Sequence, residues 1–220
     1  MDGINNLYDR QSGVESQTDE SAIVIGLGGL GSWIALDLAL IGVGTLIVID
    51  PDKLEASNLN RTLFKYSQIG QLKTQAIKEL ILERRPDTIV LTIEDFFKSD
   101  YLDKYKVDFI FDATDNLSTR QMIHDYNQYQ KQIQIPNFNP VPYCKSGYDG
   151  YHATLSINDF KSGRWGDEGS YTVVPSFFGT PQILSAMAVI EMLLNYSAQE
   201  YSYNFNVKKI IKQNQRTIIN

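Results

Sequence analysis

Residues 21–31 read SAIVIGLGGLG, a short apolar run that leads directly into a glycine-rich turn. The apolar run predicts a buried β-strand at 21–25, and the residues from 32 to 41, which precede Gly42, predict a helix. A strand, a glycine turn and a helix in this order are typical of the first half of a nucleotide-binding βαβ unit. This stretch therefore predicts an α/β fold.

The glycines of this turn have distinct physical roles. Gly26, Gly28 and Gly31 allow a tight turn, a close approach of the backbone to a phosphate, and close packing of helix against strand. The start of the helix presents unpaired backbone N–H groups and a positive partial charge. Asp50 ends the next predicted strand, where a carboxylate can accept hydrogen bonds from a ribose. Together these residues predict a bound nucleotide but do not distinguish NAD from ATP.

Strands and helices continue to alternate along the chain. We expect further strands at 45–50, 89–92, 107–112 and 132–137, and helices at 73–85, 117–130 and 182–194. Residues 151–157 alternate like a half-exposed antiparallel strand. The predicted fold is α/β: a Rossmann-like, mostly parallel sheet flanked by helices, with an antiparallel C-terminal extension.

Length and composition indicate one main globular unit. The chain has 220 residues, of which 43% are hydrophobic and 21% charged, and this suits a sizeable core without wholesale disorder. We divide it into an N-terminal arm at 1–20, a folded domain at 21–200 and a C-terminal β-like tail at 201–220. The polar, glycine-rich stretch at 159–170 predicts a long loop.

Charge and cysteine content exclude several classes of site. The net charge of −6 argues against a broad surface for nucleic acid. One cysteine, Cys144, and two histidines, His124 and His152, form neither a disulfide nor a thiolate-rich zinc site, so we expect no zinc. The polar, acidic N-terminus lacks a secretory pattern, and Pro, Gly and Glu residues interrupt the apolar run at 173–196. We therefore expect a cytoplasmic protein without a membrane span.

Charged and amide side chains follow successive predicted strands. Asn58 and Arg61 come after the second strand, Lys73 begins the next predicted helix, and Asp115 and Asn116 follow the fourth strand. The carboxyl ends of parallel strands meet at one edge of the sheet, where ligands bind. Arginine and lysine contact phosphate oxygens, and a carboxylate binds magnesium. Two cations, a carboxylate and a glycine turn describe a triphosphate with its metal better than a dinucleotide.

At these positions the chain resembles the ThiF/MoeB superfamily, which includes sulfur-carrier activators and the adenylation domains of ubiquitin-activating enzymes. The resemblance runs from residue 8 to about residue 196. It rests on five motifs in the family's order and close to its spacing: YDRQ at 8–11, GLGGLG at 26–31, SNLNR at 57–61, GQLK at 70–73 and DATDN at 112–116. It identifies residues 21–200 as a ThiF/MoeB-like adenylation domain.

The resemblance implies a reaction and roles for individual residues. The reaction is ATP- and Mg²⁺-dependent adenylation of a carboxylate, which yields an acyl adenylate and pyrophosphate. Asp115 would serve the magnesium, and Arg10 would reach into the ATP site of the neighbouring subunit. The expected catalytic residues are Arg10, Arg61, Lys73 and Asp115. The expected nucleotide-binding residues are Gly26, Gly28, Gly29, Gly31, Asp50, Asn58, Arg61, Lys73, Asp115 and Asn116.

The family also implies partners. The substrate carboxylate is expected on the C-terminal glycine of a small ubiquitin-like or sulfur-carrier protein, or on a peptide, and a homodimer is expected. The apolar helix at 182–194 is a candidate for the dimer interface. The substrate and the group that accepts the adenylate both stay open.

The chain departs from the family at its cysteines. Many relatives carry paired CxxC motifs for zinc and a nucleophilic cysteine in the loop that corresponds to 166–172, and neither is present here. Cys144 is then the one candidate for a thioester, and we interpret it as a passive, buried thiol.

Two other functions stay open. An NAD(P)-dependent oxidoreductase would need only the glycine turn and Asp50, which leaves Arg61, Lys73 and Asp115 superfluous. A non-catalytic ThiF-like module would use the apolar helix to bind a partner.

Overall fold

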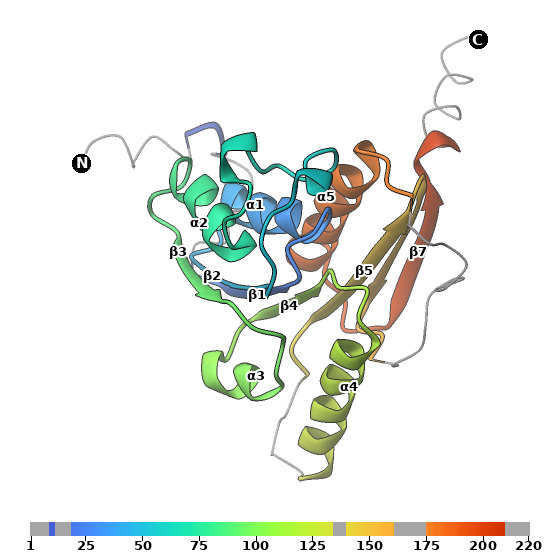
Figure 1. Ribbon diagram of the computed structural model, residues 1–220. Helices are drawn as coiled ribbons and strands as arrows, with labels where there is room; N and C mark the ends of the chain where they lie inside the picture. Colours follow the sequence, from blue (N-terminus) through green and yellow to red (C-terminus); the bar gives the residue numbers. More distant parts are fainter. Residues whose placement is uncertain (1–8, 12–18, 134–139, 161–174, 210–220) are drawn as a thin grey trace.

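The computed structural model describes residues 9–11, 19–133, 140–160 and 175–209, and its centre is a seven-stranded sheet (Figure 1). The strands are β1 (Ser21–Ile25), β2 (Thr45–Ile49), β3 (Ile89–Ile93), β4 (Phe109–Asp112), β5 (Tyr143–Asp149), β6 (His152–Ile157) and β7 (Tyr201–Asn206). Their order across the sheet is β3-β2-β1-β4-β5-β6-β7. Strands β1 to β5 pair in parallel, whereas β6 pairs antiparallel with β5 and β7 antiparallel with β6. The predicted fold class is confirmed.

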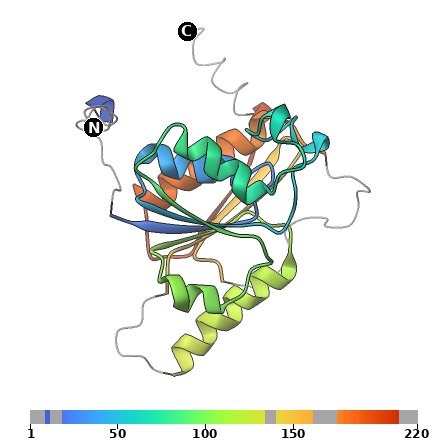
Figure 2. The ribbon, with the colours of Figure 1, turned by 60° about the vertical axis from the view of Figure 1, so that its left-hand side comes forward.

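Helices cover both faces of the sheet (Figure 2). They are α1 (Gly31–Ile41), α2 (Lys73–Leu82), α3 (Asp100–Tyr105), α4 (Leu117–Gln132) and α5 (Gly179–Leu193), with short 3-10 turns η1 (Asp9–Gln11), η2 (Ala56–Asn58) and η3 (Tyr66–Gln68). Helices α1, α2 and α5 lie on one face, and α3 and α4 lie on the other. Within the described ranges, no helix has both the length and the apolar character that a membrane span needs.

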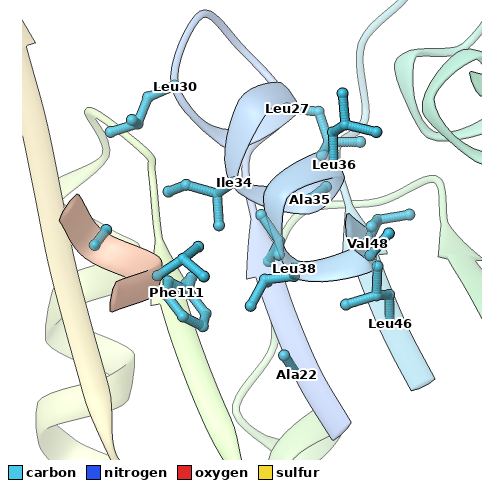
Figure 3. Packing of buried hydrophobic residues seen from close by; sticks show 14 of the residues in the cluster. Ala22, Leu27, Leu30, Ile34, Ala35, Leu36, Leu38, Leu46, Val48 and Phe111 are labelled. Carbon is cyan, nitrogen blue, oxygen red and sulfur yellow. The ribbon is translucent and has the colours of Figure 1, made fainter. Parts of the chain in front are cut away.

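The strands bury side chains on both faces, as expected for a sheet with helices on either side. In β1, Ala22 and Val24 belong to the core beneath α1, whereas Ile23 and Ile25 belong to the core on the opposite face. Figure 3 shows Ile34 and Leu38 of α1 directed at the sheet, next to Phe111 of β4. Burial of a side chain of this size stabilises the fold by about 1.5–3 kcal/mol. Helix α1 is therefore fixed against the centre of the sheet.

Most predicted elements are confirmed, but α3 and β5 were not predicted. Strand β5 reads YCKSGYD and buries Lys145 and Ser146, so it shows no apolar run. The strand predicted at 132–137 is wrong at its first residue, since Gln132 ends α4, and residues 134–139 lie outside the described ranges. Most of the predicted loop at 159–170 also lies outside them.

In the glycine turn, the start of α1 approaches the end of β1 too closely for a side chain at Gly31. A Cβ atom at Gly31 would overlap the carbonyl oxygen of Gly26, and Gly26 itself has φ +85°, a left-handed conformation that favours glycine. By contrast, a Cβ at Gly28 would meet no atom within 4 Å. The backbone of the turn therefore depends on Gly26 and Gly31, whereas Gly28 borders open space.

We predict that Gly31→Ala destabilises the fold by about 3 kcal/mol, because its methyl group overlaps backbone that has no room to move. The matched variant Gly28→Ala should change the free energy of unfolding by less than about 0.5 kcal/mol. Urea unfolding monitored by circular dichroism compares the two variants. Equal midpoints would show that Gly31 is not the point of close approach.

Candidate functional site

A cavity of about 710 Å³ opens at the carboxyl ends of the parallel strands. It lies at the ends of β1 and β4, where the order of strands across the sheet reverses. From β1 the chain continues to β2 and β3 on one side, and β4 and β5 then lie on the other side of β1. Ligands of open α/β sheets bind at such a switch point. The volume is in the usual range for small-molecule sites.

The glycine turn forms one wall of this cavity. Gly26, Gly28 and Gly29 line it, and Gly31 starts α1 directly behind them. The residue at the N-cap of α1 is Leu30, whose side chain has no acceptor for the first backbone N–H groups of the helix. The N-terminus of α1 therefore presents its positive end to the cavity, which favours a bound anion.

Asp50, at the end of β2, ties the turn to the neighbouring strand. It is 5% exposed; its Oδ2 accepts a hydrogen bond from the Leu27 backbone N at 2.7 Å, and its Oδ1 accepts one from the Asp52 backbone N at 2.8 Å. Lys73 Nζ lies 3.4 Å from Asp50 Oδ1 and 2.8 Å from Asp52 Oδ2. The first residue of α2 thus brings an ammonium group, shared between two carboxylates, to the cavity wall.

Arg61 reaches the cavity from the loop after η2. Its Nη1 donates to the Ser57 carbonyl oxygen at 2.7 Å and to Asn60 Oδ1 at 2.9 Å, and Trp33 Nε1 donates to the Arg61 carbonyl at 3.0 Å. Asn58 is not among the cavity-lining residues; its Oδ1 accepts from the Glu55 backbone N at 3.0 Å and shapes the loop. The loop therefore positions one guanidinium group beside the glycine turn.

A buried polar network supports the turn after β4. Asp112 is fully buried; its Oδ1 accepts from the Thr114 backbone N at 2.9 Å and from Thr114 Oγ1 at 2.7 Å, and its Oδ2 accepts from the Tyr143 hydroxyl at 3.0 Å. Arg120 Nη2 donates to the Thr114 carbonyl at 3.0 Å, and Arg120 Nε lies 3.9 Å from Asp112 Oδ2. Burial raises the pKa of Asp112, against the opposing effect of the Thr114 hydrogen bonds.

This network places Asp115 and Asn116, the two residues after Thr114, at the cavity. Asp115 lines it with an exposed side chain, and Asn116 caps α4 by accepting a hydrogen bond from the Ser118 backbone N at 2.9 Å. Arg120 also lines the cavity and was not predicted. Its position on the first turns of the helix that follows Asp115 is the signal that could have identified it.

Arg10 lies outside this group. It belongs to η1, is exposed, and precedes Gln11, whose Nε2 donates to the Leu40 carbonyl at 2.8 Å. Leu40 is in the last turn of α1, and the helix begins at the cavity, about 14 Å away at 1.5 Å per residue. Arg10 is therefore held at the end of α1 that is distant from its own chain's cavity.

The cavity thus brings together most of the predicted residues. These are Gly26, Gly28, Gly29, Asp50, Arg61, Lys73, Asp115 and Asn116, whereas Arg10, Gly31 and Asn58 do not line it. Residues that were not predicted form the opposite wall, and they come from the end of β5, from β6 and from the segment before α5: Tyr148, Asp149, His152, Thr154, Pro175 and Ser176.

Cys144 lies away from the cavity, in the core beneath α5. It is a fully buried free cysteine, and burial raises the pKa of its thiol. The predicted burial is confirmed, and it supports the interpretation as a passive thiol, because a nucleophilic cysteine needs an accessible thiolate.

Similarity to known proteins identifies the family of this chain. The ThiF family matches residues 7–164. The chain belongs to the ThiF family. Curated relatives include the tRNA threonylcarbamoyladenosine dehydratase of Haemophilus influenzae, 37% identical over 134 residues, which cover 59% of this chain and 51% of the relative. The Sulfur carrier protein ThiS adenylyltransferase of Escherichia coli is 36% identical over 115 residues, covering 51% of this chain and 46% of that protein.

A third relative matches a larger share of the chain. The Adenylyltransferase and sulfurtransferase MOCS3-1 of Zea mays is 39% identical over 198 residues, covering 80% of this chain and 41% of its own length. The ThiF-family chain described here spans about half the length of these curated relatives or less. Among solved structures, E. coli MccB with ATP has a TM-score of 0.63 at 21% identity, covering 86% of this chain and 64% of MccB, a likeness in fold.

We predict that Arg120→Met destabilises the protein by about 3 kcal/mol, because it removes the buried cation whose Nε lies 3.9 Å from Asp112 Oδ2. The control Lys131→Met removes an exposed cation from the last turn of the same helix and should change stability by less than about 0.5 kcal/mol. Urea unfolding at neutral pH measures both, and equal effects would exclude a structural role for Arg120.

Proposed function

We propose that this chain binds ATP with magnesium in the cavity and catalyses the adenylation of a carboxylate. The observation that carries this proposal is the convergence of the α1 N-terminus, Arg61, Lys73 and Asp115 on one cavity at the switch point of the sheet. The names of the ThiS adenylyltransferase and of MOCS3-1 support it, as does the solved MccB with ATP.

The cavity divides naturally between the two reactants. The β2 and β3 side carries Asp50 and the aromatic residue Phe96, which is 64% exposed, and it suits the ribose and the adenine base. Gly29, Arg61 and Lys73 then face the phosphates. The wall formed by β5 and β6 is left for the substrate that carries the carboxylate.

Asp115 is suited to magnesium. Magnesium bound with a nucleotide usually takes one or two protein carboxylates, with phosphate oxygens and water as its other ligands. Asp115 is an exposed carboxylate on the cavity wall that Arg61 and Lys73 also line. Among the residues that the structure describes, no cluster of three or more acids, histidines or cysteines could bind a metal by itself, so phosphate oxygens would complete the coordination. When bound, the ion would neutralise phosphate charge.

In the proposed reaction, the protein itself forms no covalent bond with either substrate. A carboxylate oxygen forms a bond to the α-phosphorus, the bond from that phosphorus to the bridging oxygen breaks, and pyrophosphate leaves. No general base is needed, because a carboxylate is ionised at neutral pH. Arg61 and Lys73 contribute by holding the phosphates in line and neutralising the charge that moves to the leaving group.

For the substrate, we propose the C-terminal carboxylate of a small sulfur-carrier protein, a ubiquitin-like protein or a peptide. The ThiS adenylyltransferase is named for a sulfur carrier, and MccB was solved with MccA, including an N-formylated form. The relative named for tRNA offers an alternative, and the net charge of −6 disfavours it here.

We also propose a homodimer that uses the outer face of α5. Its inner residues pack against α1 and the sheet, but Ile183, Ile190 and Leu194 stay 38%, 44% and 39% exposed along one side of the helix. An apolar row of this kind is typical of a subunit interface. Because Arg10 is held away from its own cavity, the proposed dimer would direct it to the partner's cavity.

We predict that Arg61→Ala weakens ATP binding by about 1–3 kcal/mol, because it removes a guanidinium group that pairs with phosphate. Isothermal titration calorimetry with ATP and Mg²⁺ measures the loss, with NAD as the comparison ligand. The control Arg84→Ala removes an exposed arginine that does not line the cavity, and it should leave the affinity unchanged.

Two results would contradict the nucleotide assignment. Tighter binding of NAD than of ATP to the wild-type protein would favour an oxidoreductase. Equal ATP affinity of the wild type and Arg61→Ala would remove Arg61 from the site.

We predict that Arg10→Ala and Asp115→Ala are each inactive alone but recover activity when mixed. In a mixed dimer, one cavity combines the intact Asp115 of its own chain with the intact Arg10 of the partner. Random exchange makes half of the dimers mixed, so about a quarter of wild-type activity should return. ATP–pyrophosphate exchange with peptides and small proteins that end in glycine measures this.

Light scattering provides the control for this experiment. A monomeric protein would exclude the role of Arg10 in the partner's site. Mass spectrometry of the mixture establishes whether subunits exchange, and exchange without any recovery of activity would lead to the same conclusion.

A further inference from the structure

Tyr148 brings a hydroxyl group onto the glycine turn from the opposite wall of the cavity. It lies near the end of β5, and its Oη is 2.9 Å from Ser176 Oγ. A Cβ atom built on Gly29 would overlap this hydroxyl, so Oη lies directly over the backbone of Gly29. The turn is therefore contacted by a residue from a strand that pairs neither with β1 nor with β2.

Arg61 converges on the same point. Its Cγ and Cδ lie 3.1 and 3.2 Å from the position of that same Cβ. Gly29 is thus enclosed between an arginine stem and a phenol, at the N-terminus of α1. An anion placed there would lie near the N-terminus of α1, the Arg61 side chain and the Tyr148 hydroxyl.

The hydroxyl of Tyr148 is available as a donor. Burial raises the pKa of Tyr148, and the opposing effects of Ser176 and Arg61 are smaller, so the phenol keeps its proton at neutral pH. A hydroxyl group donates one hydrogen bond and accepts others, so Tyr148 can accept from Ser176 while it donates to an oxyanion. Hydrogen bonds to charged acceptors are the stronger class.

We propose that Tyr148 is a phosphate-binding residue, whose hydroxyl donates a hydrogen bond to the nucleotide phosphate that lies on Gly29, with Ser176 fixing its orientation. This rests on the proposed binding of ATP. It assigns the β5 wall a part in nucleotide binding, in addition to any contact with the second substrate. Tyr148 would thus connect the two halves of the cavity.

The test compares ATP with adenosine, which has no phosphate. Tyr148→Phe should weaken ATP binding about tenfold, as expected for a hydrogen bond to a charged group, and should leave adenosine binding within about twofold. Titration calorimetry in the presence of Mg²⁺ measures both affinities. The control Tyr126→Phe removes a hydroxyl that donates to Asp103, remote from the cavity, and should change neither affinity.

Several outcomes would overturn this role. If Tyr148→Phe binds ATP as tightly as wild type, or more tightly, the phosphates displace the hydroxyl rather than bind it. An equal loss for ATP and adenosine would indicate general damage to the cavity. A wild-type protein that does not bind ATP would overturn the proposed function and this inference together, and that result is distinct from the other two.

A second measurement tests the geometry without a nucleotide. Gly29→Ala introduces a methyl group that overlaps the Tyr148 hydroxyl, and Tyr148→Phe removes that hydroxyl. The loss in melting temperature caused by Gly29→Ala should therefore be smaller, by about 3 °C, in the Tyr148→Phe background. Additive effects would place the hydroxyl away from Gly29 and would overturn the proposal.

Discussion

The contact between the Gly31 position and the Gly26 carbonyl determines where helix α1 begins, and other parts of the site depend on it. Because no side chain separates them, the first turn of α1 starts directly at the end of β1. The same closeness brings backbone N–H groups to the cavity, and Asp50 then fixes the turn by accepting a hydrogen bond from Leu27. The close approach at Gly31 thus gives the cavity the positive end of a helix.

The rest of the cavity is built from strand ends that are held by buried polar groups. Asp112, Arg120 and Tyr143 orient the turn that carries Asp115, much as Asp50 orients the glycine turn. A buried polar group without partners destabilises a fold, so such networks allow few alternative arrangements. In this ThiF-family chain, the candidate ligand-binding residues on both sides of the switch point are therefore held by rigid turns.

The sequence predicts the part of the site whose residues follow the ends of the parallel strands. Residues such as Arg61, Lys73 and Asp115 could be grouped because the carboxyl ends of parallel strands share one edge. Tyr148 could not, since its position depends on the register of β5, whereas Arg120 could have been identified from its place in the first turn of the helix that follows Asp115. Strand β5 was not predicted because Lys145 interrupts its apolar pattern. Lys145 is only 1% exposed, and its Nζ lies 2.8 Å from Asp159 Oδ2.

Cys144 has a use that follows from its burial. It is the single cysteine of the chain, and it lies on β5 in the core beneath α5. A thiol reagent reacts with the exposed thiolate, so modification requires the helix or the strand to separate from the rest of the core. The rate of labelling therefore reports the opening of this part of the sheet, and the native chain carries its own chemical probe of local unfolding.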